Sequence, residues 1–172
     1  LNRAFVTRGL TYLNKREKPG IAALLELADV NAEKQVTAED CGWRLGPRIN
    51  AGGRISDSTL GARCLITDDP EEGRVLAEEL HRCNAERQAL EAEVTAQALA
   101  QASGYERGLT RRSVIAVVTG HEGVVGISAA RVREAVDAPA IVLTSDHEGH
   151  LKGSARSVPG FDIGHAIISA RR

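Results

Sequence analysis

The feature that most restricts the fold is a long helical pattern over residues 69–103, DPEEGRVLAEELHRCNAERQALEAEVTAQALAQAS. Asp69 followed by Pro70 is typical of a helix start, because aspartate caps free amides and proline fits the first turn. A helix of this length extends about 50 Å, which is longer than a compact domain of this size needs. Its apolar positions follow a spacing of four and three residues, which Arg87 interrupts: Leu76, Leu80, Cys83, Leu90 and Val94. We therefore expect a connector between two lobes, with a coiled-coil dimer through the same stripe as the alternative.

The residues before this stretch predict short helices. Residues 2–14 and 20–29 have helical patterns, and Pro19 with Gly20 separates them. Thr37 begins a further short helix, with Asp40 in the capping-box position. Ser56 or Ser58 begins the last one before the long helix. The N-terminal part of the chain should therefore be helical.

The residues after the long stretch follow a different pattern. Residues 113–120 and 139–145 are typical of buried strands, and residues 124–136 lie between them as an amphipathic helix. This order predicts a βαβ unit with a parallel strand pair. A turn, a strand ending at 157 and a helix over 161–172 complete the chain. We expect an α/β fold with a partial, mostly parallel sheet, divided into 1–68, 69–103 and 104–172.

Composition excludes several classes of protein. Of 172 residues, 42% are hydrophobic and 26% are charged, as in an ordinary globular protein, and no apolar run is long enough to cross a bilayer. The three cysteines form no CxxC pair, which argues against a disulfide framework and a thiolate zinc site. We expect a cytoplasmic protein without a signal peptide. Because the chain contains no Met, we also expect it to be a piece of a longer protein.

Charge is distributed unevenly along the chain. Residues 1–68 and 104–172 each carry a net charge of +2, and residues 69–103 carry −5, for a total of −1. The whole chain is therefore no general polyanion binder, and an anion site must be built locally.

The segment GPRINAGGR, residues 46–54, is the first candidate for such a site. Its glycines and Asn50 predict a bend, and Arg48 and Arg54 flank this bend with two fixed positive charges. Two surface arginines that cover apolar neighbours are the alternative interpretation. We interpret Arg48, Asn50 and Arg54 as anion-binding residues.

Two later segments are also suited to phosphate. In LKGSARSVPG, Ser154 and Arg156 share one face of a predicted strand and Ser157 follows, so that a hydroxyl and a guanidinium lie side by side. In VVTGHEGVVG, a strand turns into a helix through His121 and Gly123, where free amides favour an anion. An exposed polar edge strand and a plain tight turn are the alternatives.

Residues that would break a bond are missing from the pattern. No Asp/His cluster has metal-ligand spacing, and no nucleophile, base and acid follow one another. Phe, Tyr and Trp total only five residues, too few to predict a stacking platform. The chain is thus suited to hold phosphate and not, unaided, to hydrolyse it.

Together these segments resemble RecJ-type single-strand-specific exonucleases of the DHH phosphoesterase superfamily. GPRINAGGR is similar to their PRINAxGR stretch, HEGVVGISAARV to their HxGVxGIxAxRx motif, and KGSARSVPGFDI to their GSxRS strand. The helix at 69–103 resembles their interdomain helix, including an NxxR element at Asn84 and Arg87.

The resemblance implies an enzyme of two lobes. An N-terminal DHH lobe would hold Mn²⁺ or Mg²⁺ and activate water, and a DHH-associated lobe would bind single-stranded DNA, which is degraded 5′ to 3′ in repair and recombination. Arg48, Asn50, Arg54, His121, Gly123, Ser154, Arg156 and Ser157 match the substrate-binding motifs. This chain would lack the catalytic metal ligands, need no cofactor of its own and be inactive alone.

Several alternatives stay open at this point. Within the superfamily, the substrate could be a short oligoribonucleotide or a cyclic dinucleotide. Outside it, the chain could be a module that binds nucleic acid or a partner protein without hydrolysis. We expect a monomer that does not associate with membranes, with the dimer through residues 69–103 as the competing state.

Overall fold

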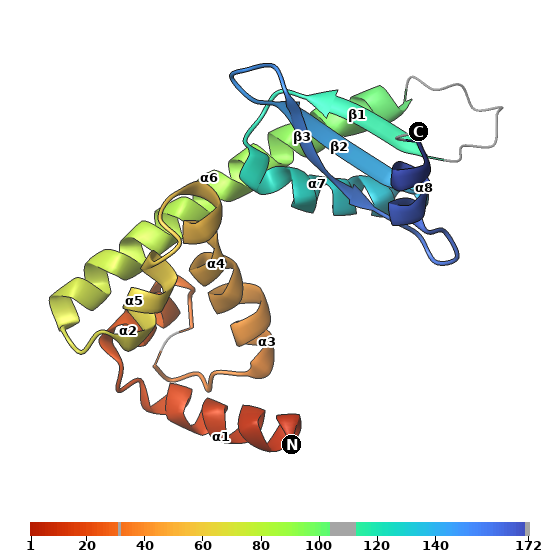
Figure 1. Cartoon of the computed structure of the whole chain (residues 1–172). Helices are drawn as coiled ribbons and strands as arrows, with labels where there is room; N and C mark the ends of the chain where they lie inside the picture. The colour runs from red at the N-terminus through yellow and green to blue at the C-terminus, as the bar shows by residue number, and fades with distance from the viewer. Residues whose placement is uncertain (31, 104–112, 171–172) are drawn as a thin grey trace. The chain divides into compact units, whose positions relative to one another are not determined.

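The computed structural model describes residues 1–30, 32–103 and 113–170 (Figure 1). Contacts within the chain divide it into two units, Leu1–Arg87 and Gln88–Arg172. The mixed α/β fold expected from the sequence is confirmed. No helix in these ranges has both the length and the apolar character needed to span a membrane. The division into 1–68, 69–103 and 104–172 stays a prediction.

Unit 1 is made of helices, as the sequence predicted. They are α1 (Asn2–Lys15), α2 (Pro19–Leu27), α3 (Ala38–Asp40), the π-helical turn Cys41–Leu45, α4 (Gly46–Ile55), α5 (Leu60–Ile66) and the first part of α6 (Pro70–Ser103). The predicted start of α6 is confirmed, because the Asp69 carboxylate accepts hydrogen bonds from the amides of Glu71 and Glu72. The predicted cap of α5 is wrong, because Thr59 is at the N-cap position and makes no side-chain capping hydrogen bond. In the turn before the helix, the Asp57 carboxylate accepts from the Thr59 amide at 2.8 Å.

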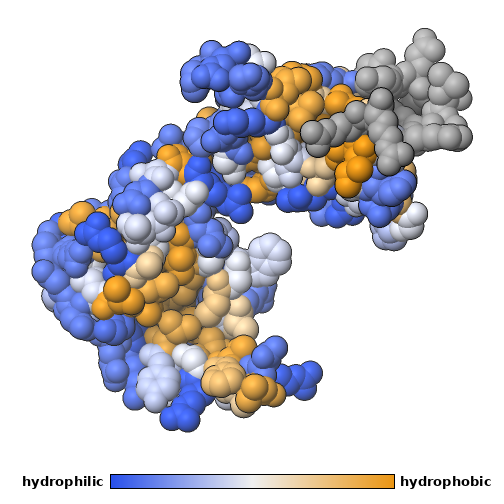
Figure 2. All heavy atoms as spheres, in the orientation of Figure 1, coloured by the Kyte–Doolittle hydropathy of each residue, from blue (hydrophilic) through white to orange (hydrophobic). Residues whose placement is uncertain are grey.

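One apolar core joins the helices of unit 1. Figure 2 shows apolar side chains, in orange, on the inner side of these helices. Cys64 and Cys83 are buried, and the three cysteines are free thiols. Burial raises the pKa of the Cys64 thiol to about 11. The core residues are Leu24, Leu25, Ala28, Val30, Val36, Leu45, Leu60, Cys64, Leu76, Ala77 and Leu80.

The capping box at the start of α3 is confirmed. The Thr37 hydroxyl accepts from the Asp40 amide at 3.2 Å, and the Asp40 carboxylate accepts from the Thr37 amide at 3.0 Å. The Thr37 hydroxyl also donates to this carboxylate at 2.8 Å, and the donation from the Thr37 amide and hydroxyl holds the pKa of Asp40 below its ordinary value. Arg44 adds an ion pair at 3.2 Å to the same carboxylate.

This capping box predicts a pH dependence of stability. Because the pKa of Asp40 is lower in the folded chain, its stabilising contribution is present above the unfolded pKa of about 3.9 and is lost as pH falls through the folded value. We expect Asp40→Asn to unfold more easily near neutral pH and to lose less stability on acidification. Melting temperatures measured against pH would check this, and parallel curves for both proteins would contradict it. Thr37→Ala should cost about 1 kcal/mol at neutral pH.

Unit 2 is a three-stranded sheet with helices. Its elements are the last part of α6, β1 (Val114–Val118), α7 (Glu122–Val136), β2 (Ala140–Ser145), β3 (Leu151–Arg156) and α8 (Ile163–Ala170). The predicted parallel pair is confirmed between β1 and β2, with Val114 opposite Ala140. β3 is antiparallel to β2, with Arg156 opposite Ala140 and Leu151 opposite Ser145, so the sheet is mixed.

β1 differs from the predicted fully buried strand. Its side chains alternate, and Ile115 and Val117 are 53% and 49% exposed. The physical reason is that α7 packs on the opposite face of the sheet, in contact with β2 and β3 (Figure 1). An uninterrupted run of β-branched residues does not show whether one face or both faces are covered.

Two glutamines of α6 hydrogen-bond the outer edge of β1. Gln97 exchanges two hydrogen bonds with the backbone of Thr119, both at 3.0 Å. Gln101 does the same with the amide and carbonyl of Val117, at 3.1 and 2.6 Å. The two side chains lie one helical turn apart and therefore share a face of α6. They take the place of a neighbouring strand and satisfy an edge that would otherwise be open.

Candidate nucleic-acid interface

The segment GPRINAGGR is a helix, and the predicted bend is wrong. Residues 46–55 form α4, with Pro47 in its first turn, where a proline is tolerated. Gly52 is buried. A Cβ at this position would lie 2.9 Å from the Asp57 carbonyl oxygen and 3.3 Å from the Leu60 Cβ, so a larger residue would not fit without a shift. These glycines do not provide a left-handed backbone angle. At Gly52, glycine instead permits close approach of α4 to the chain that follows it.

The helix separates the three residues that the bend was predicted to bring together. Asn50 and Arg54 are exposed and lie four residues apart, so they share the outer face of α4. Arg48 lies on the inner side with the buried Ala51 and Gly52. Its guanidinium donates to the carbonyls of Arg44 at 2.8 Å and Leu27 at 3.3 Å.

Arg48 thus has a structural role in unit 1. Burial is the main cause that lowers its pKa below the ordinary arginine value. It is one of three arginines that donate to the chain at the end of α2: Arg44 bonds the Ala28 carbonyl at 2.7 Å, and Arg16 bonds the Val30 carbonyl at 2.8 Å. Cations are favourable at a helix C-terminus, where carbonyls have no partner within the helix. These contacts with backbone carbonyls differ from both sequence predictions, which were a phosphate contact and a surface arginine that covers apolar neighbours.

In β3, the predicted pairing of Ser154 and Arg156 is confirmed. The Arg156 guanidinium donates to the Ser154 hydroxyl at 3.1 Å, and both side chains lie over Gly126 of α7. A Cβ at Gly126 would lie 3.5 Å from each of them. Arg156 is exposed, and Ser154 is half-buried. A hydroxyl and a guanidinium that face solvent together are suited to a phosphate group.

Ser157 does not join this pair. It follows the last residue of β3, and its hydroxyl donates to the carbonyl of Phe161 and, at 3.4 Å, to that of Val158. Because successive side chains of an extended chain point to opposite sides, Ser157 should point away from the Ser154 face. The contacts indicate that Ser157 stabilises the turn before α8.

His121 caps the helix that it was predicted to precede. Its Nδ1 accepts the hydrogen bond of the Gly123 amide at 3.0 Å, so this amide is bound within the chain. The Nε2 atom of His121 is the nitrogen that is left to contact a ligand. The turn is held to β2, because the Thr144 hydroxyl donates to the Gly120 carbonyl at 2.8 Å.

Register separates the His121 turn from Arg156 along the sheet. Thr144, which holds the turn, lies four residues along β2 from Ala140, and Ala140 is opposite Arg156. The two backbone positions are therefore about 13 Å apart along the strand. Lys152 is opposite Thr144 and is therefore level with the His121 turn along the strand. Sequence reasoning did not select Lys152, although the same alternation that paired Ser154 with Arg156 also includes it.

The described residues do not form a metal centre. In residues 1–30, 32–103 and 113–170, no group of three His, Cys, Asp or Glu side chains could hold a metal ion. Among the predicted anion-binding residues, two pairs each lie on one face of one element: Asn50 with Arg54 on α4, and Ser154 with Arg156 on β3.

The relatives and the solved structures described below are RecJ proteins. No model of a protein family matches the chain. The single-stranded-DNA-specific exonuclease RecJ of Escherichia coli is 38% identical over 170 residues, which is 96% of this chain and 29% of that protein. RecJ of Bacillus subtilis is 33% identical over 172 residues, covering 99% of this chain and 22% of that protein.

Solved structures give the same result for the fold. The Mg²⁺ complex of RecJ from Thermus thermophilus matches with a TM-score of 0.81 and 30% identity, over 99% of this chain and 26% of that one. A manganese-bound exonuclease RecJ matches with a TM-score of 0.81 over 97% of this chain. The chain spans less than a third of the curated relatives described above. Over nearly its whole length, this chain is similar in sequence and in fold to one segment of these RecJ proteins.

Proposed function

We propose that this chain is the substrate-binding part of a single-stranded-DNA-specific exonuclease, which hydrolyses phosphodiester bonds from the 5′ end. The observation that carries the proposal is the exposed Ser154–Arg156 pair on β3, within a chain that is similar in sequence and fold to RecJ proteins. The single-stranded DNA backbone repeats a phosphate at every nucleotide. A guanidinium can hold such a group by two charge-assisted hydrogen bonds.

The role of this chain in the reaction would be to bind and orient the strand. Arg156 and Ser154 would hold phosphate, Arg54 and Asn50 would supply a second contact, and the Nε2 atom of His121 a further one. Fixed positive charge near the phosphate also stabilises the charge that develops during phosphoryl transfer. The convergence of Arg54 and Arg156 on one strand stays a prediction. We place Arg48 outside this set because its guanidinium is bound to backbone carbonyls.

Divalent metal belongs to the proposal only for the complete enzyme. The matched RecJ structures contain Mg²⁺ or Mn²⁺. The described residues of this chain do not fit such a site, so we derive no step through a metal that they would hold. We propose that the catalytic ligands lie outside this chain, and that the enzyme acts as a monomer in the cytoplasm.

The complete gene product provides the direct test of the activity. We expect it to degrade long single strands from the 5′ end with Mn²⁺ or Mg²⁺ and to leave blunt duplexes intact. Strands labelled at either end would report the polarity. Hydrolysis confined to dinucleotides or cyclic dinucleotides would replace the proposal with the superfamily alternative, and binding without hydrolysis would leave a nucleic-acid-binding module.

Arg156→Gln should weaken binding to single-stranded DNA at least tenfold, because a hydrogen bond to a charged group contributes about 1.5–3 kcal/mol. Loss of one phosphate contact should also make the negative slope of log K against log salt shallower by about 0.7. Fluorescence anisotropy of a labelled oligothymidylate at several salt concentrations would measure both quantities. Arg133→Gln on α7 is the charge-matched control. Equal effects of the two variants would show that Arg156 contributes only general charge.

A further inference from the structure

Three polar side chains occupy one face of β3. Lys152, Ser154 and Arg156 alternate along the strand, so they point to the side of the sheet on which α7 packs. Neighbouring members of this row are about 7 Å apart along the strand. Ser154 and Arg156 form the phosphate pair of the proposed function, on which this inference depends. The first member of the row, Lys152, was assigned no role.

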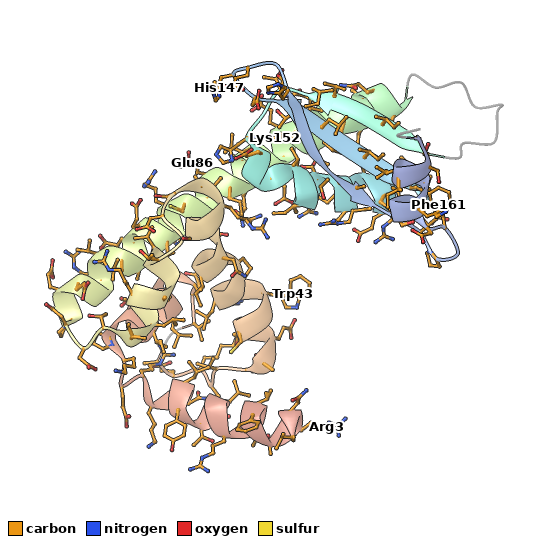
Figure 3. The ribbon with its side chains drawn as sticks, in the orientation of Figure 1. Arg3, Trp43, Glu86, His147, Lys152 and Phe161 are labelled. Carbon is orange, nitrogen blue, oxygen red and sulfur yellow. The ribbon has the colours of Figure 1, made fainter. Side chains whose placement is uncertain are left out.

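Contacts place Lys152 at the beginning of α7. Its Nζ atom lies 3.5 Å from the Glu122 carboxylate and 3.8 Å from the Asp146 carboxylate (Figure 3). Glu122 is the first residue of α7 and follows His121. Because Lys152 is opposite Thr144, it joins the His121 turn to the Ser154–Arg156 pair. The row is therefore continuous from the turn to the end of β3.

The two carboxylates near Lys152 differ in how they are held. Asp146 is mostly buried, and its Oδ1 atom accepts hydrogen bonds from the amides of Glu148 and His150, both at 2.9 Å. Asp146 therefore belongs to the turn between β2 and β3. The Glu122 and Lys152 side chains are 63% and 56% exposed. An exposed ion pair of this kind contributes little stability, and either member can exchange its partner at small cost.

We propose that Lys152 is an additional phosphate-binding residue for single-stranded DNA, and that the Glu122 carboxylate competes with the DNA for it. Lys152 would contact a phosphate of the same strand that Ser154 and Arg156 hold. The Glu122 carboxylate pairs with the Lys152 ammonium group when no DNA is bound, and its negative charge repels an approaching phosphate. The Glu122–Lys152 pair would thus limit the affinity of the site and favour release of the strand.

Opposite effects are expected from the two neutral variants. Lys152→Gln should weaken binding about two- to fivefold, in the range of an exposed ion pair. It should also make the negative slope of log K against log salt shallower by about 0.7. Glu122→Gln should strengthen binding by a similar factor, since it removes a competing anion. The gain should be smaller in the Lys152→Gln background, because the two residues act on each other.

The complete gene product, with EDTA present so that no strand is cut, is titrated into a labelled oligothymidylate at several salt concentrations. Arg133→Gln and Glu134→Gln reproduce the two charge changes near the other end of α7, about 16 Å along the helix from Glu122. Unfolding curves should coincide for the variants of Lys152, Glu122 and Glu134, because these side chains are 56%, 63% and 64% exposed. The Arg133 side chain is half-buried, so the unfolding curve of Arg133→Gln is measured as well.

The outcomes separate this inference from the proposed function. If Arg156→Gln weakens binding while Lys152→Gln behaves like Arg133→Gln, the Lys152 contact is wrong and the proposed function stands. If Glu122→Gln binds no more tightly than Glu134→Gln, Glu122 does not compete. If the wild-type protein binds no oligothymidylate even at low ionic strength, the proposed function and this inference both fail.

Discussion

Replacing Gly20 with alanine should lower the free energy of unfolding of unit 1 by about 3 kcal/mol, at the upper end of the usual cost of overpacking. A Cβ at Gly20 would lie 1.9 Å from the carbonyl oxygen of Cys64 and 2.9 Å from its Sγ atom. The nearest atom belongs to the backbone of α5, so no side-chain rotation relieves the contact. α2 or α5 would have to move, and both contribute to the apolar core.

Gly73 shows that the start of α6 packs just as closely. A Cβ there would lie 2.7 Å from the Gly20 amide nitrogen and 3.0 Å from Pro19. A shift of α2 away from α5 would therefore disturb its contact with α6 as well. The measurement is urea unfolding followed by hydrogen exchange of peptides from α2 and α5.

Gly9→Ala is the matched control for this substitution. Gly9 lies within α1, and no atom lies within 4 Å of a Cβ placed there. Alanine should stabilise that helix by up to about 1 kcal/mol, because glycine is the poorer helix former. The same chemical change should thus have opposite signs at the two positions. Equal stability of Gly20→Ala and the wild type would show that α2 and α5 do not pack as described.

Gly153→Ala should have a comparable effect in unit 2 and should also disrupt the phosphate-binding strand. A Cβ at Gly153 would lie 2.2 Å from the Val142 carbonyl oxygen and 2.6 Å from the Leu143 side chain. β3 would have to move away from β2, which breaks the pairing that positions Ser154 and Arg156. We expect a loss of about 3 kcal/mol and a loss of DNA binding larger than that of Arg156→Gln.

Gly126→Ala is the control for Gly153→Ala: it also replaces a glycine in unit 2, but it should not displace β3. Gly126 lies in α7, and a Cβ there would make ordinary contacts of 3.5 Å with Arg156 and Ser154. It should keep or raise the stability of unit 2 and keep the strand in place. Hydrogen exchange of β3 and DNA binding would be measured on both variants. Protection of β3 that is unchanged in Gly153→Ala would contradict the expected displacement.

Secondary structure with a strong local signal could be predicted from the sequence. The long helix begins at Pro70 and ends at Ser103, as its apolar spacing and Asp69 cap indicated. The Thr37 capping box and the parallel β1–β2 pair were also predicted. In each case the deciding interactions lie within a few residues, or follow from a general rule of chain connection.

The local prediction was wrong where glycine had two possible meanings. Gly52 and Gly53 indicated a bend, since glycine is common in turns. In the structure they lie in a helix, and Gly52 is needed for contact with residues 57–60. A sequence does not show which neighbour will approach a glycine from elsewhere in the chain. That helix places Arg48 on the inner face of α4, and Asn50 with Arg54 on its outer face.

What the sequence by itself determined was the type and order of the elements and the Ser154–Arg156 pair, because side-chain periodicity in helices and strands is a local property. Only the tertiary structure decided that Arg48 binds the end of α2, that His121 uses the Gly123 amide, and that Lys152 lies beside Glu122. Each of these depends on segments that are distant in sequence or on the orientation of one side chain. Such contacts are selected by packing of the whole unit, since a guanidinium or an ammonium group has several possible hydrogen-bond acceptors and the fold brings only some of them within reach.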